Sequence, residues 1–346
     1  MKKVFVGLSG GVDSSVAAAL LIEQGYDVTG VYMKNWSKDL PGFPCPWKED
    51  YQDAKRVAVK LGIKFELFDF EKEYFEKVVE YMLDGFKTGV TPNPDIMCNQ
   101  EIKFKLFYDV AISKGADYIA TGHYAQTNNG QLLKAVDENK DQTYFLYRIS
   151  RDALEHTLFP IGHLTKPQVR KEAEKRKLIT AYKKESMGIC FVGKVGIKEF
   201  LTQYVETVPG PIIDTDKKTV GEHDGAIFYT IGQRHGLDVG GGLPYYVIGK
   251  DMDTNTVYVS RDISNKRLWL DEINLESVHW INFAPKDQQK TQVRARHRAK
   301  LVECSIGNFS KKKAIVRPVE PIRAITPGQS AVIYSENICL GGGIIC

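Results

Sequence analysis

The first residues able to do chemistry form a stretch rich in glycine and hydroxyl groups, Ser9-Gly10-Gly11-Val12-Asp13-Ser14-Ser15. An apolar run typical of a buried strand precedes it (residues 4–8), and a run typical of a helix follows (16–22). Glycines let the backbone turn and let a ligand approach it closely. Because the first amides of a helix have no partners inside it, the stretch predicts a nest of N–H donors for a phosphate group.

Two common phosphate motifs do not fit this stretch. No Gly-Lys-Ser/Thr follows the turn, as the Walker A motif requires, and G-x-G-x-x-G is absent. The stretch resembles the pyrophosphate loop of ATP pyrophosphatases, which split ATP into AMP and pyrophosphate to adenylate a carbonyl oxygen. The alternative is a glycine-rich turn with an ordinary helix cap, which the position directly after the first strand disfavours.

Cys98 is the second chemical candidate, within Thr91-Pro92-Asn93-Pro94-Asp95-Ile96-Met97-Cys98-Asn99. Two prolines stiffen this stretch and keep it out of a helix. We expect a helix to begin at Gln100, which would place the thiol near a helix N-terminus and favour the thiolate. Asp95 is close enough in sequence to handle a proton. The alternative is a small buried core residue, a common fate of free cysteine.

The other five cysteines give weaker signals. Cys190 follows Lys183 and Lys184, but apolar neighbours make core packing an even alternative. Cys45, in a proline-rich loop, could be exposed. The remaining three have no His or Asp at metal-ligand spacing and are interpreted as structural: Cys304, Cys339 and Cys346. No C-x-x-C occurs, so we expect no zinc ribbon, redox pair or metal site.

Further polar residues have both a functional and a structural interpretation. His123 follows a strand end, where functional side chains are favoured over core packing. Lys140-Asp141-Gln142 is either a surface contact or a polar turn. Arg294, Arg296 and Arg298 alternate as in a strand, so we expect them to share one face suited to phosphates.

The elements that must position these residues alternate between strand and helix in the first part of the chain. We expect strands at 27–33, 63–69 and 116–120, and helices at 49–61, 71–86 and 100–114. This alternation predicts a parallel sheet with helices on both faces and a ligand at the C-terminal strand ends. Four loops should meet there: 9–15, the chain near Met33, 91–98 and 121–123.

Short β-rich runs punctuated by Gly and Pro replace this pattern beyond about residue 207. We therefore expect an α/β domain over 1–206, a central β domain over 207–276 and a C-terminal β domain, a small barrel, over 277–346. Asn129-Gly130 predicts a hairpin turn within the first domain.

Composition excludes some classes of protein. The chain has 346 residues, 26% charged and 43% hydrophobic, as in globular proteins. No apolar run is long enough to span a bilayer, and the first strand leaves no room for a signal peptide. Six scattered cysteines favour a reduced, cytoplasmic setting.

Basic residues gather in two blocks although the net charge is only +4. Eight Lys/Arg lie between Lys166 and Lys184, and ten between Lys286 and Arg317. Two such blocks suggest a polyanion larger than ATP, whereas a solvated face would explain either block alone.

Taken together, the motifs resemble the tRNA-specific 2-thiouridylases, the MnmA/TrmU family, over essentially the whole chain. In order, the matching stretches are SGGVDSS, VYMKNW, TPNPDIMCN-x-x-IKF, ATGHYA, KDQTYFL, SMGICF, GEHDGAIFYTIGQRHGL and TPGQSAVIYSENICLGGGII. The resemblance implies an adenine-nucleotide α-hydrolase-like ATP pyrophosphatase domain followed by two all-β domains. It also implies ATP- and Mg²⁺-dependent 2-thiolation of the wobble uridine in the anticodon stem-loop of tRNAs for Lys, Glu and Gln, with a persulfide-carrying protein as sulfur donor.

The resemblance assigns roles to matching positions. It implies Cys98 as nucleophile, Cys190 as persulfide carrier and Asp95 as a further catalytic residue. ATP-contacting positions would be Gly7, Leu8, Ser9, Gly10, Gly11, Val12, Asp13, Ser14, Met33 and Gly122. RNA-contacting positions would be Asn93, Pro94, Asp95, His123, Lys140, Asp141, Gln142, Arg296, His297 and Gln329. Some members carry another Cys three residues after the nucleophile, linked to an iron–sulfur cluster; here that position is Glu101, which argues against such a cluster.

Two alternatives stay open at this point. One is an ATP-dependent ligase, similar to argininosuccinate synthase, which would need neither paired cysteines nor basic blocks. The other is a non-catalytic tRNA-binding protein with a decayed nucleotide loop, which the intact SGGVDSS and both cysteines disfavour. The route of sulfur, by direct attack or as free hydrosulfide, is open as well.

Overall fold

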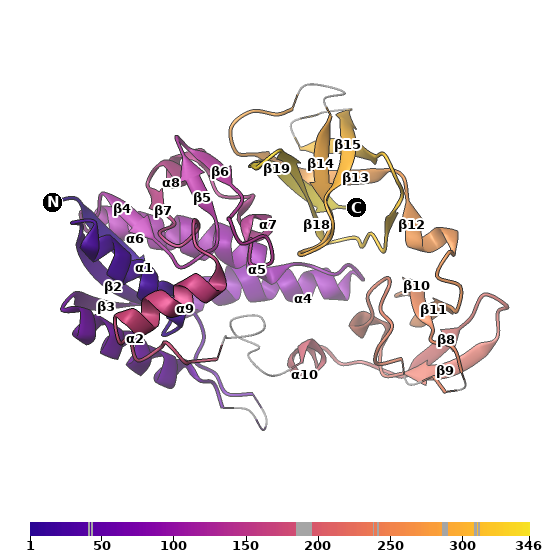
Figure 1. Ribbon diagram of the computed structural model, residues 1–346. Coiled ribbons are helices and arrows are strands. Elements are labelled where there is room, and N and C mark those ends of the chain that lie inside the picture. The colour runs from indigo at the N-terminus through magenta and orange to yellow at the C-terminus, as the bar shows by residue number, and fades with distance from the viewer. Residues whose placement is uncertain are drawn as a thin grey trace.

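The computed structural model describes residues 1–40, 42, 44–184, 196–237, 239–240, 242–285, 290–307, 310 and 312–346. Figure 1 shows an α/β domain, a C-terminal β-barrel beside it and a smaller β domain joined to both. Within the described residues, no helix combines the length and apolar character needed to cross a membrane.

The α/β domain is built on a parallel sheet of five strands in the order β3-β2-β1-β4-β7. The strands are β1 (Lys3–Gly7), β2 (Asp27–Lys34), β3 (Lys64–Asp69), β4 (Tyr118–Ala120) and β7 (Thr157–Leu158). Alternate residues of β1 enter different cores, since side chains alternate across a strand. Val4 and Val6 pack with α1 (Val12–Glu23) and α2 (Trp47–Leu61), and Phe5 packs with helices of the opposite face. The predicted parallel sheet with helices on both faces is confirmed.

Two long helical runs cover that opposite face. One comprises α3 (Glu71–Tyr74), η1 (Phe75–Val79) and α4 (Glu80–Lys87); the other comprises α5 (Pro94–Met97), η2 (Cys98–Leu106) and α6 (Phe107–Ser113). The second run begins six residues before the Gln100 that the sequence suggested. The reason is local: Asn93 caps the helix by accepting a hydrogen bond from the Ile96 amide at 3.3 Å, and proline is well tolerated in the first turn.

A hairpin of the first domain extends the sheet of the barrel. Strands β5 (Gln126–Asn128) and β6 (Gln131–Leu133) are joined by Asn129 and Gly130, both with positive φ, which confirms the predicted turn. Strand β6 then pairs with the barrel strand β19. The helices that complete this domain are α7 (Thr143–Leu146), α8 (Arg151–Glu155), α9 (Lys166–Lys175) and α10 (Ile197–Leu201).

The central domain is a sheet in the order β10-β11-β8-β9. Its elements are β8 (Gly210–Ile213), β9 (Thr219–His223), η3 (Ala226–Phe228), β10 (Tyr246–Asp251) and β11 (Thr256–Ser260). Helix η4 (Lys266–Leu268) and the short pair β12 (Trp269–Leu270) and β17 (Ile322–Arg323) connect it to the barrel.

The barrel closes through pairing of its first and last strands, β13 and β19. Its strands are β13 (Ile273–Trp280), β14 (Thr291–Arg294), β15 (Val302–Gly307), β16 (Lys313–Pro318), β18 (Ser330–Ser335) and β19 (Ile338–Ile345). Ile273 and Leu275 already lie in the barrel core. The expected boundary between residues 276 and 277 therefore falls inside β13.

Candidate active site

The turn between β1 and α1 has a backbone that only glycine allows at one position. Gly10 has φ of +73°, and a Cβ there would lie 2.4 Å from the carbonyl oxygen of Asp50. The Ser14 hydroxyl lies 3.2 Å from the Ser9 amide that donates to it, and the Ser15 hydroxyl donates to the Gly11 carbonyl at 2.7 Å. The turn is thus braced by its own side chains, and the first amides of α1 face the end of the sheet.

The ends of the neighbouring strands lie close to this turn, as the sequence predicted. A Cβ on Gly7 would lie 2.9 Å from the methyl carbon of Met33, at the end of β2. A Cβ on Gly122 would lie 2.6 Å from the Ser14 amide nitrogen. The expected ATP-contacting positions are therefore brought together at one edge of the sheet, where parallel sheets bind their ligands.

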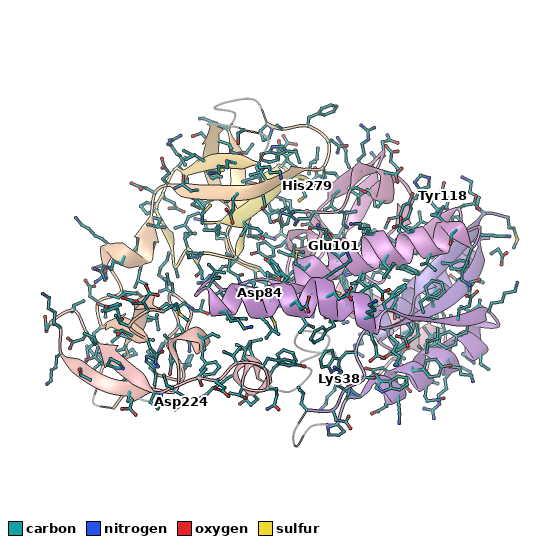
Figure 2. The ribbon with its side chains drawn as sticks, turned by 180° about the vertical axis from the view of Figure 1, so that it is seen from behind. Lys38, Asp84, Glu101, Tyr118, Asp224 and His279 are labelled. Atoms are coloured by element: carbon teal, nitrogen blue, oxygen red, sulfur yellow. The ribbon has the colours of Figure 1, made fainter. Side chains whose placement is uncertain are left out.

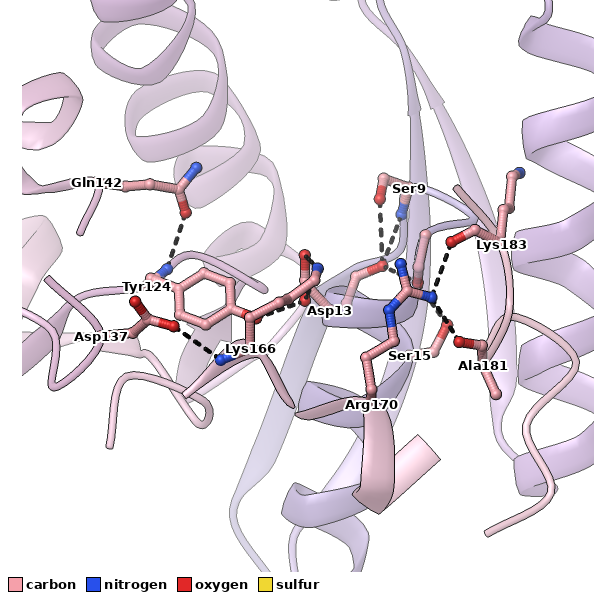
Figure 3. Close-up of polar contacts among 12 residues, drawn as sticks. Ser9, Asp13, Ser15, Tyr124, Asp137, Gln142, Lys166, Arg170, Ala181 and Lys183 are labelled. Carbon is pink, nitrogen blue, oxygen red and sulfur yellow. Dashed lines mark hydrogen bonds and ion pairs between the residues drawn. The ribbon is translucent and has the colours of Figure 1, made fainter. Parts of the chain in front are cut away.

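The Asp13 carboxylate binds two side chains from distant parts of the chain, as Figure 3 shows. The Lys166 ammonium lies 2.8 Å from each of its carboxylate oxygens, and the Tyr124 hydroxyl donates to it at 2.8 Å. The sequence placed Lys166 in a surface basic block and missed this contact. The sequence does carry a signal for this contact. Thr165-Lys166-Pro167 marks a helix start, and this start places a lysine in the first turn of α9, beside α1.

Half of the first basic block forms contacts within the molecule. Arg170 donates to the carbonyl oxygens of Ala181 and Lys183 (Figure 3). The Lys183 ammonium pairs with Asp50 at 2.8 Å and with Asp53 at 2.6 Å. Arg176 pairs with Glu23 and Glu172. Four of the eight cations thus hold the fold together, and four lie exposed: Lys171, Lys175, Lys177 and Lys184.

Cys98 lies in the main core, only 2% exposed, among residues such as Ile102 and Phe104. It is the fifth residue of the helical run that begins at Pro94, not a residue of the first turn. The favourable effect of a helix N-terminus falls off within that first turn, so it supports the thiolate less than we expected. Cys190 lies outside the described residues.

Two of the three cysteines interpreted as structural are buried in the barrel. Burial raises the pKa of the Cys304 thiol to about 11 and raises that of the Cys339 thiol as well. Cys346 is exposed and Cys45 is half-buried. None of these four forms a disulfide among the described residues.

His123 lies between the nucleotide turn and the Cys98 helix. It follows Gly122, which touches Ser14, and its ring lies 5.6 Å from that of Phe104, six residues beyond Cys98. Its Nδ1 is 2.8 Å from the Thr121 hydroxyl oxygen. Burial among aromatic rings, with a smaller contribution from Lys103, lowers the pKa of His123 well below its usual range.

The stretch 140–142 was expected to contact RNA, and its middle residue is buried. Asp141 is 3% exposed and pairs with Arg294 of β14 at 3.0 Å. It also accepts hydrogen bonds from the Thr143 hydroxyl and the Ala135 amide. Gln142 accepts from the Tyr124 amide at 2.9 Å. Asp141 therefore joins the α/β domain to the barrel and offers no free surface for RNA in this conformation.

The three arginines expected on one face have different surroundings. Arg294 is half-buried and pairs with Asp141, and Arg296 donates to the Ile231 carbonyl at 2.8 Å and the Thr326 hydroxyl at 2.6 Å. Arg298 is exposed and, with Lys140, Arg294, Glu138 and Asn139, lines a cleft of about 420 Å³. Two arginines of the second block thus line a mixed but mainly cationic cleft between residues 138–140 and the barrel.

His297 and Gln329 complete the expected RNA-contacting set. The His297 ring lies 4.4 Å from that of Phe145, and burial, with the charges of Arg298 and Arg294, lowers its pKa to about 4. Gln329 donates to the Thr91 carbonyl at 2.8 Å and contacts the Pro92 carbonyl at 3.4 Å. Gln329 therefore reaches the stretch before the Cys98 helix, and His297 reaches α7.

No group of three or more His, Cys, Asp or Glu side chains suited to a metal ion occurs in the part of the chain that the structure describes. Asp13 is the carboxylate at the nucleotide turn. Its two oxygens suit a hard cation, although they face Lys166 and Tyr124 here. A Mg²⁺ ion at this place would need further oxygens from a bound nucleotide.

Comparisons with known proteins cover the whole chain. Three family models match consecutive parts: the tRNA methyl transferase HUP domain (2–194), the tRNA methyl transferase PRC-barrel domain (198–261) and the aminomethyltransferase beta-barrel domain (270–345). The chain is 46% identical to tRNA-specific 2-thiouridylase MnmA of Idiomarina loihiensis, over 99% of this chain and 96% of that protein. It is equally 46% identical to the protein of that name from Bacillus subtilis, over 99% and 94%.

Solved structures give a more distant likeness. A 4-thiouridine synthetase in complex with RNA and ATP is 16% identical, covering 58% of this chain and 50% of that chain, with a TM-score of 0.38. The NMN synthetase of Francisella tularensis is 19% identical over 54% of this chain and 66% of that chain, with a TM-score of 0.35. Scores this low carry no argument about the reaction.

Proposed function

The chain belongs to the family of tRNA-specific 2-thiouridylases, and from this membership we propose that it replaces the 2-oxygen of a tRNA wobble uridine by sulfur. Relatives of that name match 99% of the chain at 46% identity, which is the observation that carries the proposal. Transfer RNAs for Lys, Glu and Gln are the substrates we propose. The descriptions of the family models name methyl transfer, whereas the full-length relatives name thiolation, and we follow the full-length relatives.

ATP is the activating co-substrate in this proposal. The amides of the first turn of α1 would bind its phosphates, with Met33 and Gly122 beside the nucleotide. The uridine 2-oxygen would attack the α-phosphorus, and pyrophosphate would leave. Asp13 would hold Mg²⁺ together with the phosphates, and the ion would offset their negative charge. Lys166, 2.8 Å from Asp13, places a second positive charge at this edge.

Sulfur transfer requires two cysteines in this proposal. Cys190 would receive sulfur from a persulfide-carrying donor protein, and its terminal sulfur would attack the activated carbon as AMP leaves. Cys98 thiolate would then attack the Cys190 sulfur, freeing the thiolate on the base and forming a disulfide. The other route begins with attack by Cys98 on the persulfide, which frees hydrosulfide to attack the base. Either route ends in a disulfide that a dithiol must reduce by two electrons.

Cys98 must become accessible for this chemistry. It is 2% exposed, so the base can reach it only after the side chains around it move. Asp95, three residues before Cys98 in the same helical run, is our candidate for moving a proton, with Asn93 and Pro94 beside the target base. The wobble base must be unstacked to enter, as for other enzymes that act on a base.

RNA binding would use cations that line the cleft beside the barrel. Lys140 and Arg298 line the cleft beside the barrel, and we propose that this cleft takes phosphates of the anticodon stem-loop. His123, Gln142, His297 and Gln329 stay candidate contacts. For Asp141 and Arg296 we propose a supporting role, since both are engaged by protein partners. A reduced cytoplasmic setting remains part of the proposal, because the disulfide has to be reduced after each turnover.

Variants of the cysteines separate the two half-reactions. Cys190→Ser should abolish formation of 2-thiouridine while RNA-dependent exchange of pyrophosphate into ATP continues. Cys346→Ser, which changes an exposed cysteine at the end of the barrel, should keep full activity and serves as the matched control. Full thiolation by Cys190→Ser with a persulfide donor would overturn the assignment of Cys190. Pyrophosphate exchange without any thiolation by the unmodified protein would favour the ligase alternative.

A further inference from the structure

A loop of the barrel binds the stretch that leads into the Cys98 helix. The Thr91 amide donates to the Pro327 carbonyl at 2.8 Å. The Gln329 side-chain amide donates back to the Thr91 carbonyl at 2.8 Å and lies 3.4 Å from the Pro92 carbonyl. Residues more than 230 apart in sequence are thus joined by hydrogen bonds in both directions.

Steric fit restricts this contact further. Gly328 has φ of +88°, and a Cβ there would lie 2.8 Å from the Thr91 nitrogen. On the other side, the ring of Pro92 lies 2.9 Å from where a Cβ on Gly85 would be. Figure 2 shows the helix that carries Asp84 reaching the boundary between barrel and central domain. Thr91 and Pro92 are therefore enclosed between α4 and the barrel loop.

The central domain reaches the same place. The Thr91 hydroxyl lies 3.2 Å from that of Thr230, and Arg296 links the Ile231 carbonyl to the Thr326 hydroxyl. All three domains thus meet at Thr91. We name this meeting point, made of residues 91–92, 230–231 and 326–329 with Arg296, the three-domain junction.

The junction lies directly before the reacting residues. Asn93 caps the helix that begins at Pro94, and Asp95 and Cys98 follow within its first five residues. A capped helical turn moves as one unit, because its backbone hydrogen bonds join residues three and four apart. A displacement of the Thr91 and Pro92 carbonyls would therefore displace Asp95 and Cys98 together.

We propose that Gln329 is a positioning residue: by binding the Thr91 and Pro92 carbonyls, it fixes the helical turn that presents Asp95 and Cys98 to the base. This inference rests on the proposed function and adds a role that RNA contact alone does not give. The side chain is half-buried and its amide group already binds two protein carbonyls. RNA reaching the barrel at this loop would therefore act on the reacting turn through Gln329.

Gln329→Glu is the sharpest variant, because it keeps the shape and replaces the donating amide by a carboxylate facing two carbonyl oxygens. We expect a loss of tenfold or more in the thiolation rate at saturating tRNA, with tRNA affinity changed less than threefold. Hydrogen exchange of peptides covering residues 88–98 should become at least several-fold faster. Gln329→Lys, whose ammonium can donate to the same carbonyls, should recover a large part of the rate and of the protection.

Arg298→Ala is the matched control, since Arg298 is an exposed barrel residue that lines the RNA cleft. It should weaken tRNA affinity and leave exchange at 88–98 unchanged. If Gln329→Glu weakens tRNA affinity alone, with exchange and saturated rate unchanged, Gln329 is only an RNA contact and the inference is wrong. If the unmodified protein makes no 2-thiouridine, the proposed function fails, and the exchange comparison still decides whether Gln329 holds the turn.

Discussion

The two halves of the candidate site are built in different ways. The nucleotide half centres on one contiguous stretch, residues 7–15, which is shaped by the glycine at position 10 and braced by its own serines, with Met33 and Gly122 packed against it. The cysteine half carries Asp95 and Cys98 on one helical run, and side chains from the barrel and the central domain bind the stretch that leads into that run. The first half therefore depends on local backbone geometry, and the second depends on how three domains meet.

A methyl group added at Gly122 should have the largest effect of the changes considered, and it should act on nucleotide binding. The new Cβ would lie 2.6 Å from the Ser14 nitrogen, so the first turn of α1 would have to move. We expect Gly122→Ala to lower the rate of pyrophosphate exchange by more than a hundredfold. Gly240→Ala is the matched control, because among the described residues no atom other than those of its chain neighbours lies within 4 Å of its Cβ position. Near-normal exchange in Gly122→Ala would mean that the turn does not bind the nucleotide.

Breaking the ion pair of Asp141 and Arg294 should destabilise the contact between the α/β domain and the barrel, on which the cysteine half depends. Both side chains are nearly buried, 2% and 11% exposed, so removing one partner leaves a buried charge. We expect Asp141→Asn to lower the free energy of unfolding by about 3 kcal/mol, measured by urea denaturation. The double variant with Arg294→Gln should lose less than the sum of the single changes.

An exposed pair in the same barrel provides the control for that comparison. Lys300 and Glu320 lie 3.2 Å apart with 79% and 56% of their side chains exposed. Lys300→Ala should therefore cost under about 1 kcal/mol. Equal losses in Asp141→Asn and Lys300→Ala would contradict the account of Asp141 as a domain link.

Acid should destabilise the contact between barrel and α/β domain by a smaller amount. The pKa of His297 is lowered from 6.5 to about 4 by burial against aromatic rings and by Arg298 and Arg294. Between these two values the unfolded chain binds more protons, so stability is full above pH 6.5 and falls as the pH drops towards 4. We expect this group to account for about 1 to 2 kcal/mol, allowing for the solvent that reaches the ring.

His297→Asn separates the contribution of His297 to the acid destabilisation from that of the other histidines. The pKa values of His123, His223 and His279 are lowered too, so the unmodified protein should lose stability over the same range. The variant's free energy of unfolding, followed by urea denaturation at several pH values, should fall less steeply. Parallel curves for both proteins would show that His297 does not titrate in this range.

The sequence was sufficient for the nucleotide half because its signals are local. Strand, glycine turn and helix follow one another within residues 3–23, and parallel topology places Met33 and Gly122 at the same edge. The cysteine half was predicted less well. The helix start was placed at Gln100, because two prolines were taken to exclude a helix. The helix begins at Pro94 instead, since Asn93 caps it and proline fits in the first turn.

Long-range partners account for the other differences. Lys166 was counted in a basic block for a polyanion, and Asp141 was assigned to a surface contact or a polar turn. A charged side chain in a polar stretch gives no sign of a partner more than 150 residues away. Gln329 and Thr91 likewise meet only when the barrel is in place. The sequence shows the two basic blocks directly. It does not show which of their cations form ion pairs and hydrogen bonds within the fold.

The proposed reaction is tested most directly by nucleoside mass spectrometry. Unmodified tRNA for Glu is incubated with the protein, ATP, Mg²⁺ and a persulfide source, and its wobble nucleoside is analysed. The account predicts replacement of one oxygen by sulfur, dependent on ATP and lost in Cys98→Ala. An unchanged wobble uridine, or equal thiolation by Cys98→Ala, would contradict it.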